Sequence, residues 1–360
     1  MTSIILADLA DAELLKDAIV TDVVIIGAGP CGLFQVFELG LLGIKAHIVD
    51  SLKQPGGQCS ELYPDKPIYD IPALPICGAQ ELIDRLLEQI HPFNAGFHLG
   101  EEVTELKQFP DHSFFLSTSA GTKFHTRTVI IAGGVGSFQP RRLGAEGTEA
   151  FEGSHIHYRV QNAADLHGRR VVVFGGGDSA LDWAIDLCGK TREMTLVHRR
   201  AEFRGAPASV AKMWDLVKQG RMTCYEALPQ SVLTEDGRFR GVSVKHTDGQ
   251  IREIEADTAL VFFGLHPKLG PIAEWGLQID KRAILVDTEK FQSNVPGIFA
   301  VGDINTYPGK KKLILSGFHE AALAAFAVTA HLNPAKKVHL QYTTTSPIMQ
   351  KRLGVDHPKE

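Results

Sequence analysis

The sequence predicts an α/β protein with two parallel sheets covered by helices, because one pattern of strand, glycine turn, helix and strand occurs twice. The first copy begins with the β-branched run 23–26 and continues into the glycine turn 27–32. The second begins with the apolar run 171–174 and the glycine turn 175–180. Each copy is a βαβ unit, and two such units imply two nucleotide sites.

The composition fits this prediction and excludes several other classes. The chain has 360 residues, 44% hydrophobic and 22% charged, as expected of a soluble globular protein with about two domains. Its net charge of −5 argues against binding nucleic acid through phosphate neutralisation. The apolar stretch 23–34 is shorter than the roughly 20 residues that span a bilayer, so no membrane contact is expected. Residues 1–20 are acidic and lack the basic start of a secretion signal, which favours a cytoplasmic location.

Each glycine of the first turn meets a separate requirement. Gly27 permits the tight turn, Gly29 lets the backbone approach a pyrophosphate, and Gly32 lets the helix pack on the strand. The pyrophosphate is then expected at the helix N-terminus, where unpaired N–H groups favour an anion. Asp50 follows Gly32 by 18 residues, and a carboxylate at this offset accepts the hydroxyls of an adenosine ribose. The alternative, a purely structural glycine turn, does not explain this acidic residue.

The second turn differs at the corresponding offset. Ala180 replaces the third glycine, an accepted variant, and 18 residues later stands His198, followed by arginines. Guanidinium groups pair with phosphate, so this turn favours the 2′-phosphate of NADPH over the free hydroxyl of NADH. A solvated basic loop is the alternative. The residues expected to contact NADPH are Gly175, Gly177, Ser179, His198, Arg199, Arg200 and Arg204.

The two turns together suggest FAD and NADPH on one chain, with a hydride passing between them. No metal site is expected, because the cysteines are odd in number and form no CxxC pair. The cysteines are Cys31, Cys59, Cys77, Cys188 and Cys224. Buried small thiols are the expectation for all of them.

These motifs, with Gly302-Asp303 in the segment 299–303, resemble the two-dinucleotide flavoproteins built like thioredoxin reductase. The resemblance implies two Rossmann-like domains, with the NADPH domain inserted into the FAD domain. It also implies that Gly302 and Asp303 meet the ribityl chain and pyrophosphate of FAD. The expected parts are the first FAD segment 1–146, the NADPH domain 147–284, and the second FAD segment with its tail 285–360.

Disulfide reductases of this group need a redox-active dithiol beside the flavin, and the sequence lacks one. No cysteine lies between Cys77 and Cys188, where thioredoxin reductase has its CxxC pair. The glutathione-reductase pattern requires a second cysteine five positions after Cys59, and Pro64 stands there. Cys59 alone leaves open a redox-active thiol or an inert buried one.

The segment 56–64, Gly-Gly-Gln-Cys-Ser-Glu-Leu-Tyr-Pro, resembles the thioredoxin-reductase-like ferredoxin–NADP+ reductases, which also lack the dithiol. By this resemblance Tyr63 stacks on the isoalloxazine ring, and Gln58 contacts the flavin. Where the family's tail often has His, this chain has Tyr342-Thr343, so Tyr342 is a second candidate for stacking. The remaining implied FAD contacts are Val103 at the adenine, Phe138 near the flavin, and Thr345 on the flavin of a partner subunit.

The resemblance implies a homodimeric enzyme that transfers a hydride between NADPH and FAD N5, and single electrons between FAD and ferredoxin or flavodoxin. A helix starting near Ser316-Gly317 would stabilise the reduced ring through its dipole. Two basic runs, 310–312 and 141–142, are candidates for docking the acidic electron carrier. Two alternatives are an NADPH-dependent reductase of small disulfides or quinones, and a nucleotide-binding redox sensor.

Overall fold

The computed structural model describes residues 11–160 and 162–355, apart from the side chains of 137–140 and 265–268. The chain divides into two compact units. Unit 1 combines Met1–Ser137 with Pro267–Glu360, and unit 2 is Phe138–His266. Strands β9 (Ser137–Pro140) and β17 (Leu265–Lys268), one on each connection between the units, pair with each other.

The main sheet of unit 1 has the order β5-β2-β1-β8-β7-β6, with β20 also paired to β8. Pairing is parallel from β5 to β8 and antiparallel from β8 to β6. The parallel part is the expected βαβ product, because a helix carries the chain from β1 back to β2. The strands are β1 (Ile19–Ile26), β2 (Ala46–Asp50), β5 (Gly96–Leu99), β6 (Val103–Gln108), β7 (Phe114–Thr118), β8 (Lys123–Ile131) and β20 (Ile298–Ala300).

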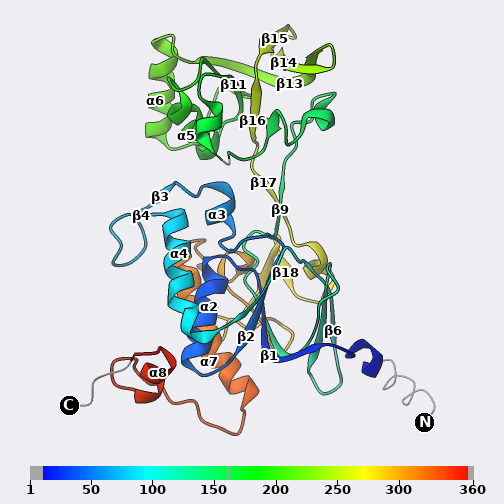
Figure 1. Cartoon of the computed structure of the whole chain (residues 1–360), viewed down its shortest axis with the longest axis vertical. Helices are drawn as coiled ribbons and strands as arrows, with labels where there is room; N and C mark the ends of the chain where they lie inside the picture. Colours follow the sequence, from blue (N-terminus) through cyan, green and yellow to red (C-terminus); the bar gives the residue numbers. More distant parts are fainter. Residues whose placement is uncertain (1–10, 161, 356–360) are drawn as a thin grey trace. The chain divides into compact units, whose positions relative to one another are not determined.

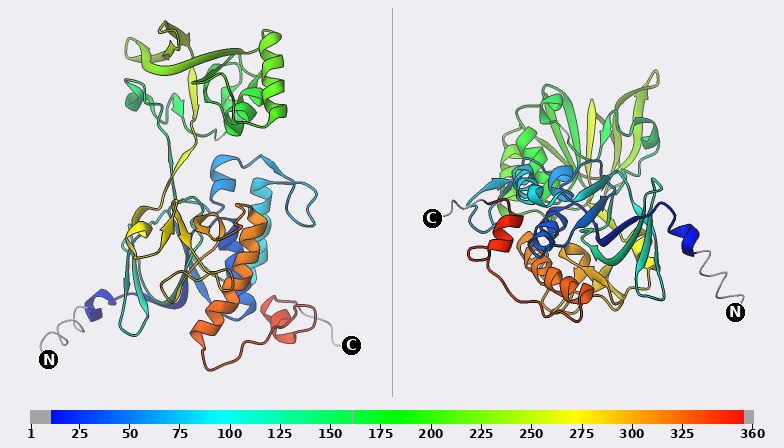
Figure 2. Two further views of the ribbon diagram at one scale, coloured as in Figure 1. Left: turned by 180° about the vertical axis from the view of Figure 1, so that it is seen from behind. Right: turned by 60° about the horizontal axis from the view of Figure 1, so that its bottom comes forward.

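Three helices pack against this sheet: α2 (Pro30–Leu41), α4 (Ala79–Ile90) and α7 (Ile314–Leu332). Helix α2 contacts both α4 and α7, and the three lie side by side in Figures 1 and 2. Alternate residues of β1 face opposite sides, so Val23 and Ile25 join the helix-side core with Leu33, while Val24 joins the core on the other face. Pro30 occupies the first turn of α2, where its missing N–H costs no hydrogen bond.

Unit 2 repeats this plan. Its sheet has the order β10-β16-β11-β12-β13-β14-β15, with parallel pairing as far as β13 and an antiparallel hairpin beyond. Val171 and Val173 face α5 and Leu181, and Val172 faces the other core. The elements are β10 (Ile156–His157), β11 (Arg170–Gly175), α5 (Asp178–Leu187), β12 (Glu193–His198), α6 (Pro207–Lys218), β13 (Thr223–Glu235), β14 (Arg238–His246), β15 (Ile251–Glu255) and β16 (Thr258–Phe262).

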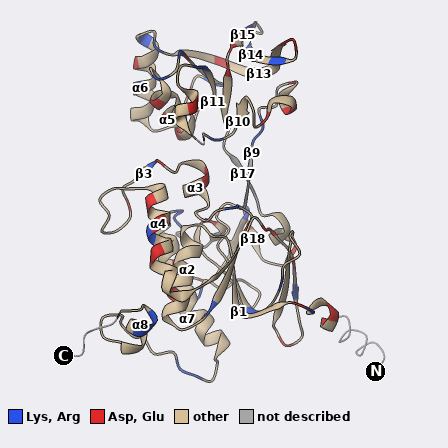
Figure 3. Ribbon diagram, viewed as in Figure 1, with Lys and Arg blue, Asp and Glu red and all other residues tan. Residues whose placement is uncertain are grey.

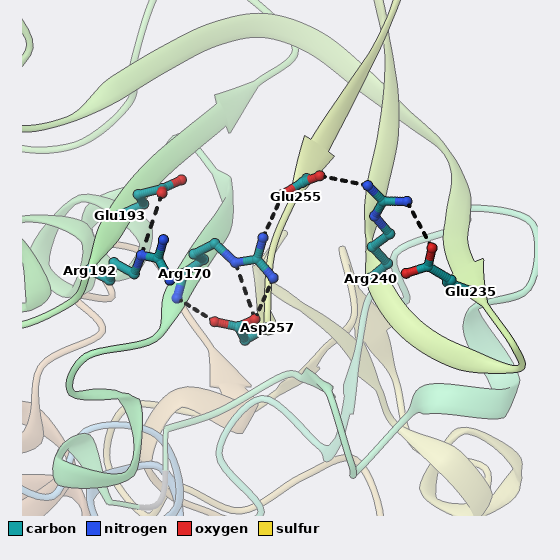
Figure 4. A network of polar contacts seen from close by, with 7 residues as sticks. All are labelled: Arg170, Arg192, Glu193, Glu235, Arg240, Glu255 and Asp257. Carbon is teal, nitrogen blue, oxygen red and sulfur yellow. Dashed lines mark hydrogen bonds and ion pairs between the residues drawn. The ribbon is translucent and has the colours of Figure 1, made fainter.

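An ion-pair network lies where β11, β14 and β15 approach one another in unit 2 (Figure 4). The Arg170 guanidinium donates to Asp257 Oδ1 from Nη2 at 2.7 Å and to Glu255 Oε2 from Nη1 at 2.6 Å. Arg240 Nη2 donates to the other oxygen of Glu255 at 2.9 Å, and its Nη1 lies 3.6 Å from Glu235. Arg170 thus joins β11 to the end of β15 and to Asp257, which directly precedes the neighbouring strand β16, whereas Arg240 joins the consecutive strands β13, β14 and β15.

A small sheet holds residues 279–285 in unit 1. Strand β19 (Ala283–Leu285) pairs with β18 (Ile279–Asp280) and, in parallel, with β21 (Asn305–Thr306) of the second FAD segment. Unit 2 runs from Phe138 to His266, whereas the sequence predicts an NADPH domain over 147–284, so both predicted bounds differ from those of the compact unit.

The remaining short elements of unit 1 are α3 (Gln58–Leu62), β3 (Pro67–Ile68), β4 (Cys77–Gly78) and α8 (Pro347–Arg352). Among the residues that the structure describes, no helix is both long and apolar enough to cross a bilayer. The α/β fold predicted from the repeated βαβ pattern is confirmed, and each of the two sheets is parallel around its βαβ unit and antiparallel beyond it.

Candidate functional site

The first glycine turn joins β1 to α2 and has no room for side chains at two positions. A Cβ on Gly27 would lie 2.4 Å from the Ala132 carbonyl oxygen, and one on Gly32 would lie 1.8 Å from the Gly27 oxygen. A Cβ on Gly29, by contrast, would meet only the Cα of Gly57, at 4.0 Å. The backbone before α2 is therefore open to a ligand, and the helix N-terminus favours an anionic one.

Asp50 lies beside this turn. Its Oδ2 accepts a hydrogen bond from the Ala28 N–H at 2.6 Å, and Oδ1 accepts from the Leu52 N–H at 2.8 Å. Burial raises the pKa of Asp50, and these two hydrogen bonds oppose the increase. Each carboxylate oxygen can accept further hydrogen bonds, so the ribose hydroxyls of a dinucleotide fit here.

The predicted flavin contacts of segment 56–64 lie at the two ends of α3, where Gln58 is its first residue and Tyr63 follows its last. Tyr63 is half-buried against the helix-side core, and burial raises its pKa above the usual range. The Gln58 amide nitrogen lies 3.7 Å from the Cβ position of Gly134, and no described residue forms a hydrogen bond with that amide. Both side chains are available to an aromatic ligand that lies beside the first turn.

Two other predicted FAD contacts differ in how they are placed. Val103 is 3% exposed in the core of the other sheet face, so its side chain is enclosed by other core residues and is not free to contact an adenine. The side chain of Phe138 lies outside the described part of the chain.

Gly302 and Asp303 lie after β20, close to the N-terminus of α2, since a Cβ on Gly302 would be 3.0 Å from Cys31 Sγ. The half-buried carboxylate of Asp303 has no hydrogen bond or ion pair within the described residues. Burial raises its pKa, and the charges of Lys312 and Lys310 lower it. A carboxylate in this state fits the hydroxyl groups of a ribityl chain, so these residues are compatible with FAD.

Helix α7 begins at Ile314, two residues before the start that the sequence predicts. Its N-cap residue, Leu313, makes no side-chain capping hydrogen bond. The first N–H groups of this helix therefore lack a side-chain acceptor and favour negative charge nearby.

The tail packs on unit 1 away from the first glycine turn. Arg352, in the basic last turn of α8, donates from Nη1 to the Leu41 carbonyl at 2.5 Å, at the C-terminal end of α2 (Figure 3). The first turn lies at the opposite end of α2, about 18 Å away for a 12-residue helix. Tyr342 and Thr345 are both exposed, and Tyr342 is 64% exposed. Within one chain, neither lies at the site that Asp50 and Asp303 form.

The second glycine turn is overlaid by an imidazole ring. A Cβ on Gly176 would lie 2.2 Å from the His198 ring, which also packs against Phe203 at 4.8 Å between centroids. His198 Nε2 donates to the Glu202 carbonyl at 3.1 Å. Burial lowers the pKa of His198, and the charges of Arg199, Arg200 and Arg204 lower it further. The positive charges of the predicted arginines therefore all act on the His198 ring, which lies beside the turn.

Two hydrogen bonds donated by backbone N–H groups tie the arginine segment to this turn, one to a carbonyl and one to a carboxylate. The Arg204 N–H donates to the Gly176 carbonyl at 2.7 Å, and the Ala206 N–H donates to Asp178 Oδ1 at 2.8 Å. Gly177 is the extended N-cap of α5 and has no side-chain cap, so the N–H groups near Ser179 are open to phosphate. Within the described part of the chain, no carboxylate pairs with Arg199, Arg200 or Arg204.

All five cysteines are free. Cys59, Cys77 and Cys188 are buried as expected, whereas Cys31 and Cys224 are half-buried. Burial raises the pKa of Cys59 to about 11, so this thiol stays protonated at neutral pH and is a poor nucleophile. Among the described residues, no three His, Cys, Asp or Glu side chains form a metal-binding group.

A buried ion pair at α7 contradicts one of the docking residues expected from the sequence. Lys310 is not a docking residue, because its side chain is only 6% exposed and pairs with the buried carboxylate of Glu320. Glu320 is the only acidic residue of α7, a helix otherwise rich in alanine and leucine. A lone acid inside such a helix was the available signal, because a buried carboxylate needs a partner.

Two glycine turns, one beside a carboxylate and one beside arginines, define a class of oxidoreductase that binds two dinucleotides. The family model described as "Pyridine nucleotide-disulphide oxidoreductase" matches residues 21–326. The chain belongs to this family.

Two relatives agree with this. The chain is 60% identical to ferredoxin–NADP reductase 2 of Cupriavidus necator over 337 residues, which cover 94% of this chain and 91% of the relative. It is 59% identical to ferredoxin–NADP reductase of Methylibium petroleiphilum, with 94% and 93% covered. The fold is similar to that of Lactococcus lactis thioredoxin reductase, with a TM-score of 0.71 and 24% identity over 87% of this chain and 99% of that one.

Proposed function

We propose that this chain is an FAD-dependent ferredoxin–NADP+ reductase. Two relatives about 60% identical to this chain are named ferredoxin–NADP reductase, and the similarity covers nearly their whole length. The structural observation that favours electron transfer to a carrier over disulfide reduction is the state of Cys59, which is buried, unpaired and protonated. Bound FAD supplies hydride acceptance and single-electron release.

The residues of unit 1 bind and orient the cofactor in this proposal. The open backbone at Gly29 and the N-terminus of α2 hold the pyrophosphate, and Asp50 accepts hydrogen bonds from the ribose. Asp303 accepts hydrogen bonds from the ribityl hydroxyls, and Tyr63 covers one face of the ring system. The uncapped N-terminus of α7 favours the added negative charge after reduction.

The residues of unit 2 select the nicotinamide dinucleotide. The N-terminus of α5 binds its pyrophosphate, and Arg199, Arg200 and Arg204 donate hydrogen bonds to the 2′-phosphate. His198 packs over the turn and adds a charge-dependent contact. NADPH is accordingly the preferred reductant.

An acidic iron–sulfur protein docks, in this proposal, on Lys311, Lys312 and the exposed side chains of Leu313 and Leu315. Basic groups steer an acidic partner, and apolar side chains give the contact its core. The second predicted basic run lies in unit 2 and is a separate candidate, in which Arg141 is exposed and Arg142 lies 3.5 Å from Glu152. Lys311→Glu is expected to lower kcat/KM for ferredoxin about tenfold at low salt and to leave ferricyanide reduction unchanged. An unchanged salt dependence for ferredoxin would count against this surface.

The tail supports a homodimer. Leu340, Tyr342 and Ile348 are large apolar side chains exposed on one chain, and such surface marks an interface. Thr345 of this tail would then reach the flavin site of a second copy. Flavodoxin is a second acceptor in this proposal, and the cytoplasm is the proposed location.

The test is anaerobic reduction of the purified protein. A flavin absorption spectrum, faster bleaching by NADPH than by NADH, and turnover with ferredoxin are the expected results. Cys59→Ser should keep that turnover, because no electrons pass through sulfur. Activity with small disulfides or quinones but none with ferredoxin would favour the alternative reductase, and very slow reduction by NADPH would favour a redox sensor.

A further inference from the structure

A buried carboxylate lies behind the Gly302–Asp303 segment and binds four donors. Glu320 is 0% exposed. Its Oε2 accepts hydrogen bonds from the Gly302 N–H at 2.7 Å and from Asn305 Nδ2 at 2.8 Å. Its Oε1 accepts from the Tyr307 hydroxyl at 2.9 Å and from the Lys310 ammonium. All four donors come from the chain between β20 and α7.

Lys310 contacts the same peptide segment from a second direction. Its Nζ pairs with Glu320 and also donates to the Gly302 carbonyl at 2.9 Å. The N–H and the C=O of Gly302 are thus both held by one buried ion pair. The adjacent lysines, Lys311 and Lys312, are exposed and take no part in this arrangement.

Close packing restricts the opposite side of Gly302. Cβ atoms built on Gly302 and Gly317 would lie 3.0 Å and 2.2 Å from Cys31 Sγ, so α2 and α7 approach the segment through this sulfur. Gly302 is tethered by Glu320 and Lys310 and packed by Cys31. The next residue is Asp303, whose carboxylate forms no hydrogen bond or close ion pair with a described residue and feels the charges of Lys312 and Lys310.

Stability alone does not account for the Lys310–Glu320 pair. Two buried charges lose their hydration, and apolar residues of similar volume are often no less stable. A charged pair does, however, fix the orientation of a peptide group through charge-assisted hydrogen bonds.

We propose that Lys310 and Glu320 are positioning residues for FAD: they orient the Gly302 peptide so that the free Asp303 carboxylate faces the hydroxyls of the ribityl chain. This inference rests on the proposed function, in which Asp303 contacts FAD. Neither positioning residue touches the cofactor.

The test compares Lys310→Met with Lys336→Met, an exposed lysine beyond the C-terminal end of α7, in the full-length holoenzyme. The measurements are the rate of FAD release on dilution, followed by flavin fluorescence, and the absorption spectrum of the bound flavin. Lys310→Met is expected to release FAD about tenfold faster and to shift the spectrum, because a charge-assisted hydrogen bond to Gly302 is lost. Lys336→Met is expected to stay within about twofold of the unaltered protein.

Lys310→Met leaves Glu320 buried without its counter-charge, so a second variant guards against unfolding. Lys310→Met/Glu320→Gln removes both charges and is expected to fold, yet still to release FAD about tenfold faster. Release of FAD at the unaltered rate by this folded double variant, with only its melting temperature changed, would overturn the inference. An unaltered protein that binds no FAD would instead contradict the proposed function.

Discussion

The two glycine turns share a backbone plan and differ in the side chain at the end of the second strand. In unit 1 that residue is Asp50, whose carboxylate accepts the N–H of Ala28 in the turn itself. In unit 2 it is His198, whose ring lies against Gly176 and whose neighbours are three arginines. The charge beside the turn is therefore negative in one unit and positive in the other.

This difference suggests that the glycine turns provide dinucleotide binding and that the ends of the second strands determine which dinucleotide binds. In the proposed function, the glycines and the helix N-terminus accept the pyrophosphate that both dinucleotides share, whereas the strand end meets the ribose, where the two dinucleotides differ. Changes to the turn should abolish binding, and changes at the strand end should alter which nucleotide binds.

The largest effect is expected for Gly32→Ala in the first turn. The added Cβ would lie 1.8 Å from the Gly27 carbonyl oxygen, a backbone atom that cannot rotate away. Overpacking of this kind costs about 3 kcal/mol, and FAD binding is expected to be lost. Thermal unfolding and flavin content check this prediction.

The matched control is Ala180→Gly in the second turn, where the sequence already tolerates a methyl group. It is expected to cost about 1 kcal/mol through helix propensity and to leave flavin content unchanged. Equal behaviour of the two variants would show that the turns do not differ in packing.

The second-largest effect is expected for Arg199→Ala/Arg200→Ala. Two charge-assisted hydrogen bonds to the 2′-phosphate should disappear, so kcat/KM for NADPH is expected to fall about 100-fold while that for NADH changes less than about twofold. Arg192→Ala, an exposed arginine 3.9 Å from Glu193, is the control. Parallel losses with both nucleotides would mean that these arginines maintain the fold rather than select the phosphate.

The sequence predicted the elements whose spacing is fixed by local geometry. Both βαβ units and the positions of Asp50 and His198 follow from the length of one turn, helix and strand. The pairing of Ile284 with Asn305 could not be predicted, because it joins segments 21 residues apart with no periodic pattern between them.

The candidate site was predicted less completely for a related reason. A run of lysines is usually solvated, and only the fold brings Glu320 to Lys310. The placement of Tyr342 away from the first turn likewise depends on how Arg352 anchors α8, a contact 311 residues apart in sequence.

A smaller effect is expected in the pH dependence of NADPH binding, because the strand end of unit 2 is a histidine that titrates. The pKa of His198 lies below 6.5, because burial and the neighbouring arginines disfavour the imidazolium. A bound 2′-phosphate favours the imidazolium, so binding should strengthen as pH falls below about 6.5. KM for NADPH is expected to fall a few-fold between about pH 7.5 and 5.5, whereas KM for NADH should not.

His198→Gln removes the titrating group and should flatten this profile. Without nucleotide the sign is reversed: the lowered pKa contributes stability that is present above pH 6.5 and lost as pH falls through the folded-state pKa. A profile unchanged in His198→Gln would assign the pH dependence to another group.

The smallest effect is expected for Arg240→Met, in the network of Figure 4. The contrast here is between charges inside unit 1 and charges on the surface of unit 2. Glu320 is fully buried, whereas the side chains of Arg240 and Glu255 are each about half exposed, so water replaces their lost contact. The unfolding midpoint is expected to fall by less than about 3 °C, with NADPH affinity unchanged. Arg170→Met should lower the unfolding midpoint more than Arg240→Met, since the Arg170 guanidinium donates three hydrogen bonds to two carboxylates.

If Arg240→Met destabilised the protein as much as Lys310→Met, solvent exposure would not decide the strength of these ion pairs, and the contrast between the units would fail.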